Sequence, residues 1–129
     1  CIRDRCNLGA DTNSSNLKNN YASVKLWNYR KKRFLDTGLQ FCGLIMGDHS
    51  KTAINTQLNT GTVVGVAANI FKSGFPPNLV DSFSWGGMKG DEKFKLEKSY
   101  EVAEKAMERR KIAITEMDKD ILKYIYNEF

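Results

Sequence analysis

The sequence predicts a mainly β domain followed by a helical tail, and three observations lead to this fold class. An aliphatic or β-branched residue recurs every six residues over 46–70, with a small residue four places after each one. Residues 15–39 interrupt this spacing, and the last third of the chain changes to the spacing of amphipathic helices. The interpretation is a parallel β-helix over residues 1–88 and a helical tail over residues 89–129.

The six-residue spacing fits neither an ordinary strand nor a helix, whose side-chain periods are 2 and 3.6 residues. It fits three short flat strands joined by corners, in which the first residue of each block points into a narrow three-sided core. In the frame set at Met46, the first and then the fifth positions are Met46, Thr52, Leu58, Val64, Ile70 and Ser50, Thr56, Thr62, Ala68, Gly74. Upstream, Ile2 with Cys6 and Leu8 with Thr12 follow the same rule.

Several features should shape the ends and corners of this repeat. Gly47 and Gly65 are expected at corners that need unusual backbone angles. The insertion, about residues 15–39, is expected to leave the core as a loop, and loops on a rigid scaffold often carry function. After Phe71, the segments SGFPPN and FSWGG should end the repeat because Pro and Gly interrupt strands.

The tail has the pattern of two short amphipathic helices. The first is expected over about Leu96–Arg110, and Thr115 is the expected N-cap of the second. The second helix should bury a stripe formed by Met117, Ile121, Leu122 and Ile125. We expect the two helices to cover the exposed strands at the end of the β-helix. A dimerising coiled coil is the alternative, but the segments are short and the heptads are not sustained.

Composition and charge limit the classes of function. The net charge of +5 arises in residues 1–39, where eight Lys and Arg stand against three Asp, so an anionic ligand is expected. Nucleic acid and a phosphorylated small molecule are both candidates, and YRKKRF is alternatively a solvated loop face. No segment is apolar enough to span a membrane, and three cysteines without framework spacing indicate a reducing, cytoplasmic location. One His and no CxxC argue against a metal site.

Two segments carry a family resemblance. NLGADT followed by SSN, and later IMGDHSKTAINTQLNTGTVVG, resemble the bifunctional N-acetylglucosamine-1-phosphate uridylyltransferase/glucosamine-1-phosphate acetyltransferase family over roughly residues 1–16 and 45–74. The resemblance implies a left-handed β-helix domain following a nucleotidyltransferase domain, and it implies a homotrimer with sites between subunits. It also implies acetyl-CoA as the cofactor and an amino-sugar phosphate as the substrate.

The resemblance assigns the candidate site residues. It implies that Asn7 and Asn16 bind the sugar phosphate and that Lys18 or Lys25 binds its phosphate group. For the coenzyme it implies Ala10, with Phe71 and Lys72 at the position of a second contact. The family's catalytic histidine corresponds to a position upstream of Cys1, so we expect further sequence there. The only imidazole, His49, is a candidate catalytic base, and the alternative is a surface histidine near a corner.

Two functions therefore remain open at this stage. The first is an acyltransferase domain that transfers an acetyl group from acetyl-CoA to an amino-sugar phosphate, attached to a sugar-1-phosphate nucleotidyltransferase. The alternative is a non-catalytic β-helix module that trimerises or regulates such an enzyme. Whether the chain is itself an enzyme is uncertain. The Gly-rich start and metal-binding carboxylates of nucleotidyl transfer are absent from it, and neither nucleic acid nor a membrane is an expected partner.

Overall fold

The strands of this protein are very short and mostly parallel, and the two helices lie at its C-terminal end. The computed structural model describes residues 5–129. Within this range the strands are β1 (Asn13–Ser14), β2 (Lys25–Asn28), β3 (Arg33–Asp36), β4 (Ile45–Met46), β5 (Lys51–Thr52), β6 (Gln57–Leu58), β7 (Val63–Val64), β8 (Asn69–Ile70), β9 (Leu79–Val80) and β10 (Trp85–Gly86). The helices are α1 (Leu96–Glu108) and α2 (Glu116–Glu128).

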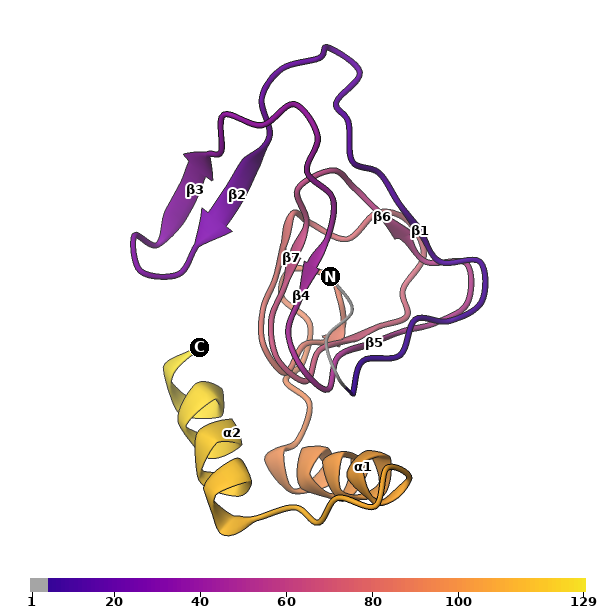
Figure 1. Ribbon diagram of the computed structural model, residues 1–129, viewed down its shortest axis with the longest axis vertical. Coiled ribbons are helices and arrows are strands. Elements are labelled where there is room, and N and C mark those ends of the chain that lie inside the picture. The colour runs from indigo at the N-terminus through magenta and orange to yellow at the C-terminus, as the bar shows by residue number, and fades with distance from the viewer. Residues whose placement is uncertain (1–4) are drawn as a thin grey trace.

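Three parallel sheets surround one core. Their strand orders are β1-β6, β10-β8-β5 and β4-β7-β9. Ile45 pairs with Val63, and Lys51 pairs with Asn69, so each partner lies 18 residues further along the chain. Eighteen residues are three of the six-residue blocks, so the chain visits the three sheets in turn before it returns to the first. Figure 1 shows the resulting triangular outline.

The predicted core positions are confirmed. Met46, Thr52, Leu58, Val64 and Ile70 are all buried. Together with Ala68 and Val80, four of them form one apolar cluster, whose members are Met46, Leu58, Val64, Ala68, Ile70 and Val80. The fifth positions are buried as well, apart from the exposed Gly74. Leu8 is half exposed because no described layer lies beyond it, and Ile2 lies outside the described residues.

The corners differ from the prediction made for Gly47 and Gly65, neither of which has a positive φ. Positive φ angles of 54–74° recur instead at the fourth position of six blocks, all but the one that begins at Ile70, at Arg5, Asp11, His49, Asn55, Gly61 and Ala67. Gly47 is needed for a different reason, which is close stacking. A Cβ atom on Gly47 would lie 2.7 Å from the carbonyl oxygen of Gly65 in the next layer.

The prediction that Gly and Pro end the repeat after Phe71 is wrong. The chain makes a further pass, in which Leu79 pairs with Val63 and Trp85 pairs with Asn69. These partners are 16 residues apart rather than 18, because the segment around the buried Pro76 takes a shorter path without forming a strand. The chain then folds back over β10, where the Trp85 amide donates to the Glu92 carbonyl at 2.9 Å.

The insertion over residues 15–39 contains an antiparallel hairpin, β2–β3, rather than only a loop. Leu26 lies opposite Leu35, and Trp27 lies opposite Phe34 with ring centroids 5.3 Å apart. Cross-strand apolar and aromatic pairs of this kind stabilise hairpins. The fully buried Val24 anchors the start of the hairpin against the rest of the protein.

The two helices are confirmed, but they pack beside the sheets rather than over the end of them. A second cluster of Ala67, Phe83, Ala103 and Leu122 joins them to one corner of the triangle, as the lower part of Figure 1 shows. Thr115 is the N-cap of α2, as predicted, and it forms a full capping box with Asp118. Half of the predicted buried stripe is wrong, since Met117 is 73% exposed and Ile121 is 53% exposed.

Candidate functional site

Two of the predicted coenzyme residues lie along one corner of the triangle. The Ala53 amide donates to the Ile70 carbonyl, and the Asn55 amide donates to the Ala10 carbonyl, both at 2.8 Å. Ala10, Ile54 and Phe71 therefore follow one another from layer to layer along the same corner. Ile54 is 67% exposed and Phe71 is 45% exposed, which leaves an apolar surface without cover.

This surface continues onto the neighbouring face through Trp85. The rings of Phe71 and Trp85 meet edge to face with centroids 5.1 Å apart, and Trp85 also stacks on Phe94 at 5.0 Å. We call the surface formed by Ile54, Phe71 and Trp85 the apolar edge. Exposed apolar patches on a folded protein commonly mark a site of interaction.

Lys72 follows Phe71 but does not have a free ammonium group. Its Nζ atom forms a close ion pair with Asp91, whose other oxygen accepts the Met88 amide at 2.8 Å. The hydrogen bond from Lys72, reinforced by that from the Met88 amide, lowers the pKa of Asp91. A phosphate group bound by Lys72 would have to compete with this carboxylate.

Asn7 lies on the face next to the apolar edge. It pairs with Lys51 in a parallel bridge, and its backbone carbonyl accepts the Thr52 amide at 2.9 Å. The backbone is thus fixed by the sheet, while the side chain of Asn7 is exposed and available to a ligand.

The other predicted substrate residues belong to the insertion. The Asn16 carbonyl accepts the Cys42 amide at 2.9 Å where the insertion begins and ends. The Lys18 carbonyl accepts the Tyr21 amide at 2.9 Å, and Lys25 lies in β2 opposite Asp36. Figure 1 shows the insertion extending from the corner between β6 and β7, whereas Ala10 and Phe71 follow the corner between β5 and β6. A single chain does not bring all the predicted residues into one pocket.

His49 lies beneath α2 at a third corner. Its side chain faces a cavity of about 160 Å³ lined by Arg5, Asp48, Asp118 and apolar residues of α2. Only 8% of His49 is exposed, and its Nδ1 atom has no hydrogen-bond partner among the described residues. Burial, aided by the charges of Arg5 and Lys51, lowers the pKa of His49, so the imidazole is neutral near pH 7.

The position of His49 bears on its candidate role as a catalytic base. A general base must come within hydrogen-bond distance of the proton that it accepts. His49 is covered by α2, and it lies at a different corner from Ala10 and Phe71. The alternative, a surface histidine near a corner, is right about the corner but wrong about the surface, because the side chain is buried.

The sequence interpretation missed a groove on the outer face of β4, β7 and β9. Its floor contains Ile45 and Val63, and its walls are Tyr29 of the hairpin turn and Ile125 and Phe129 at the end of α2. The volume of this groove is about 470 Å³. A signal was present, because both residues are apolar in each of the strands IM, VV and LV. Strands with two apolar faces are typically buried on both sides.

The described part of the chain has neither a grouped set of metal ligands nor a membrane-spanning helix. Over residues 5–129, no three His, Cys, Asp or Glu side chains are grouped so that they could hold a metal ion. In the same range, neither helix has the length and apolar character needed to cross a bilayer.

Comparison with known proteins adds no assignment. No protein-family model matches the chain, and no curated protein sequence matches it significantly.

Proposed function

We propose that this chain is the left-handed β-helix domain of a sugar-1-phosphate nucleotidyltransferase, and that it transfers an acetyl group from acetyl-CoA to an amino-sugar phosphate. The β-helix fold is supported by the 18-residue register shift and by the buried first residue of each six-residue block from Met46 to Ile70. The handedness and the reaction come from the family resemblance of residues 1–16 and 45–74.

The observation that carries the proposal is the apolar edge. Ala10 and Phe71, which the resemblance assigns to the coenzyme, follow one another along this corner, and Asn7 lies on the adjoining face. In a homotrimer the edge would be covered by a neighbouring subunit, whose own insertion carries Asn16, Lys18 and Lys25. A site between subunits would then unite residues that one chain keeps apart.

A second candidate is a non-catalytic module that trimerises or regulates the nucleotidyltransferase. Two observations favour it. His49 is buried beneath α2, so no imidazole of residues 5–129 is free to accept a proton from an amine. Lys72 is paired with Asp91 rather than free for a coenzyme phosphate. Both candidates need the apolar edge as a subunit contact, but only the first needs acetyl-CoA.

The test measures acetyl-CoA binding and turnover with the full chain. We expect acetyl-CoA to raise the melting temperature, because a ligand that binds only the folded state stabilises it. Ala10→Trp should abolish this shift by filling the coenzyme position, whereas the matched control Gln40→Trp, at an exposed site just after the insertion, should retain it.

Turnover separates the two candidates. Release of free CoA thiol on addition of glucosamine-1-phosphate supports acetyl transfer. Binding without turnover, or no thermal shift at all, supports the non-catalytic module and rules out this reaction for the chain.

A further inference from the structure

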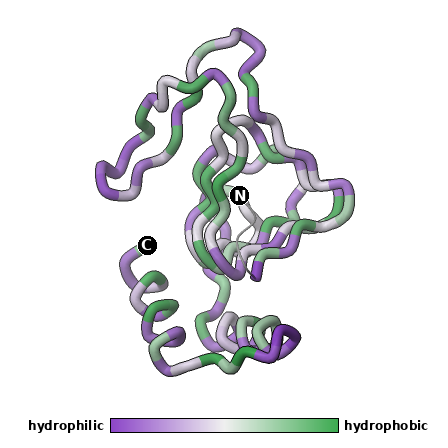
Figure 2. Tube along the Cα trace, viewed as in Figure 1, coloured by the Kyte–Doolittle hydropathy of each residue, from purple (hydrophilic) through white to green (hydrophobic). Residues whose placement is uncertain are grey.

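The groove on the outer face of β4, β7 and β9 is a concave surface that the family resemblance does not explain. We call it the side groove, and define it by Tyr29, Ile45, Val63, Ile125 and Phe129. Val63 faces outward, yet it is only 4% exposed, so the groove is deep at its centre. Figure 2 shows the hydrophobic stretch of chain where β4 and β7 lie side by side. A volume of about 470 Å³ is in the range of small-molecule sites.

An aromatic pair connects the two walls of the side groove. The rings of Tyr29 and Phe129 meet edge to face with centroids 5.6 Å apart. Both rings also line a smaller cavity of about 250 Å³, together with Trp27 and Lys32. Burial, and to a lesser degree the charge of Asp81, raises the pKa of Tyr29, so its hydroxyl remains protonated. The site therefore offers aromatic faces at the point where the two cavities meet.

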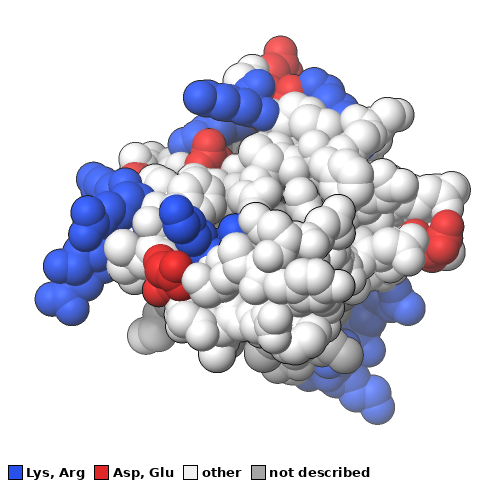
Figure 3. All heavy atoms as spheres, turned by 90° about the horizontal axis from the view of Figure 1, so that it is seen from above, with Lys and Arg blue, Asp and Glu red and all other residues white. Residues whose placement is uncertain are grey.

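Four unpaired cations lie beside this aromatic pair. Arg30, Lys31 and Lys32 occupy the turn of the hairpin directly after Tyr29, Arg33 begins β3, and all four are exposed. The turn is held by the Lys31 amide, which donates to Asn28 Oδ1 at 2.8 Å. Within residues 5–129, no carboxylate forms an ion pair with these four side chains. Figure 3 shows the Lys and Arg side chains crowded at the left edge, where the hairpin lies in Figure 1. This charge favours an anionic ligand.

The groove also contains hydrogen-bond acceptors that an alkyl chain would leave unpaired. Asp48 lines the larger cavity, and Asp81 lines the smaller one. Neither carboxylate has a hydrogen-bond donor in the described part of the chain. The amino groups of a nucleobase can donate to such oxygens, and a base also stacks on aromatic rings. The chemistry thus combines an apolar floor, aromatic rings, acceptors and adjacent cations.

We propose that the side groove binds a nucleoside polyphosphate, with its base against Tyr29 and Phe129 and its phosphates directed to Lys32 and the basic turn of the hairpin. The proposal is independent of acetyl transfer, because none of the groove residues belongs to the apolar edge. A nucleotide in this groove would bridge the hairpin and α2, two elements that otherwise meet through Tyr29 and Phe129.

The test uses the fluorescence of Trp27, which lines the smaller cavity. Trp85→Phe removes the other tryptophan, and ATP and GTP are then titrated into the full chain. We expect a saturable change in Trp27 emission. Phe129→Ala and Tyr29→Leu should each weaken binding about tenfold, since loss of base stacking on an aromatic ring costs about 1–3 kcal/mol. The unchanged melting temperature of Phe129→Ala would exclude misfolding as the cause.

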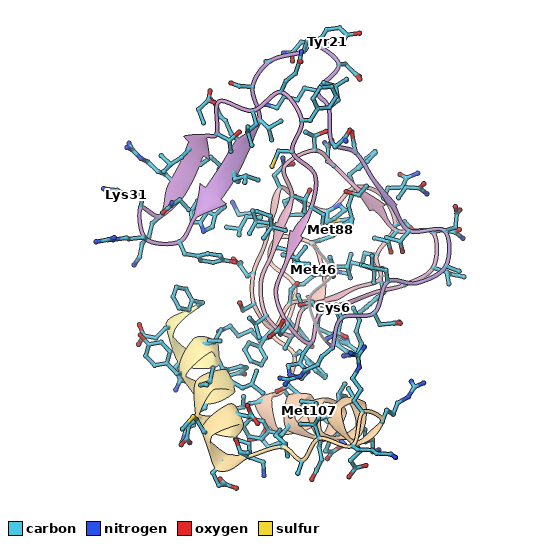
Figure 4. The ribbon with its side chains drawn as sticks, viewed as in Figure 1. Cys6, Tyr21, Lys31, Met46, Met88 and Met107 are labelled. Carbon is cyan, nitrogen blue, oxygen red and sulfur yellow. The ribbon has the colours of Figure 1, made fainter. Side chains whose placement is uncertain are left out.

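A matched pair of lysines tests the direction of the phosphates. Lys32→Gln should weaken binding several-fold, whereas Lys31→Gln should change it less than about twofold, because an exposed charge that makes no direct contact contributes little. Figure 4 shows Lys31 at the tip of the hairpin, pointing away from the sheets. Both variants remove one charge from the same turn, so general electrostatic attraction would affect them equally.

Several results would overturn the proposal. One is the absence of any saturable change with ATP and GTP. Another is tripolyphosphate binding as tightly as ATP, which would assign affinity to the basic turn alone. Stronger competition by dodecyl phosphate would indicate an alkyl ligand. Dissociation of an oligomer by Phe129→Ala would identify a second copy of this chain as the occupant.

Discussion

At the scale of single residues, the six-residue repeat is set by backbone conformation as much as by side-chain burial. The fourth residue has a φ of 54–74° in every block except the one that begins at Ile70, and most of these residues are not glycine. The left-handed conformation costs about 1–2 kcal/mol for a residue with a Cβ atom, less so for Asn and Asp. The corner is maintained because the strands on both sides are held by the neighbouring layers.

Asn55 allows a direct test, since it is an exposed corner residue with a φ of 57°. Asn55→Val should lower the free energy of unfolding by about 1–2 kcal/mol, because a β-branched residue resists this conformation. Asn55→Gly should change it by only a few tenths of a kcal/mol. The measurement is the urea midpoint of each variant. Gln57→Val is the control, since Gln57 is exposed in strand β6, where valine is well tolerated. Equal effects of the two valines would contradict this account.

His49 adds a pH dependence to the same corner. Its pKa is lowered from 6.5 by burial first, then by Arg5 and Lys51, while Asp48 and Asp118 act in the opposite direction. Below pH 6.5, His49 therefore binds a proton in the unfolded chain but stays neutral in the folded chain until the pH reaches its lowered pKa. The stability associated with neutral His49 is complete above pH 6.5 and is lost as the pH falls toward the lowered pKa.

We expect the melting temperature to fall between about pH 7.5 and pH 5.5, and to fall less in His49→Asn, which removes the imidazole and tolerates a positive φ. The carboxylates with lowered pKa values, Asp36, Asp91 and Asp118, remain ionised throughout this range. An identical fall in the variant would show that His49 is not responsible.

At the scale of the elements, the two helices begin in different ways. Thr115 accepts the Asp118 amide, and Asp118 accepts the Thr115 amide, so α2 starts with a capping box. The N-cap of α1 is Lys95, whose extended backbone suits a cap but whose side chain makes no such bond. The start of α1 therefore has a correctable defect, while that of α2 is already well formed.

Two substitutions at these caps should act in opposite directions. Thr115→Ala should lower the free energy of unfolding by about 1 kcal/mol, because an orphan helix amide loses its acceptor. Lys95→Asp should raise it, since a carboxylate can accept an amide of the first turn and lies at the positive end of the helix. Urea denaturation measures both. A loss of stability in Lys95→Asp would show that the charge of Lys95, not its missing cap, matters there.

At the scale of the whole molecule, two elements outside the sheets decide which surfaces are covered. The hairpin and α2 flank the outer face of β4, β7 and β9 and leave the side groove between them. The corner that carries Ile54 and Phe71 receives no such cover. The protein is thus asymmetric, with one face shielded within the chain and one edge open to another molecule.

The apolar edge predicts the oligomeric state. We expect light scattering to give a mass near three times the 14.6 kDa of one chain. Phe71→Glu should yield a monomer, because it places a charge in the centre of the contact. The control is Tyr21→Glu, at an exposed aromatic residue at the far end of the insertion (Figure 4). If the unmodified chain is a monomer, there is no intersubunit site, and both candidate functions fail.

The sequence by itself determined the features that depend on local spacing. The six-residue period predicted the buried residues from Met46 to Ile70, and the helical period predicted α1 and the cap at Thr115. These predictions succeed because side-chain direction follows directly from backbone period. The hairpin could also have been predicted from the paired apolar residues of KLWN and RFLD, although the sequence interpretation treated this segment as a loop.

Only the tertiary structure decided the features that depend on contacts distant in sequence. The pass through β9 and β10 continues beyond the prolines because β7 and β8 offer partners for pairing. His49 is buried because α2 packs onto its corner, and the side groove exists because Tyr29 and Phe129, 100 residues apart, meet across one face. Periodicity fixes the direction of a side chain, but which surface later covers that side chain depends on how separate elements pack together.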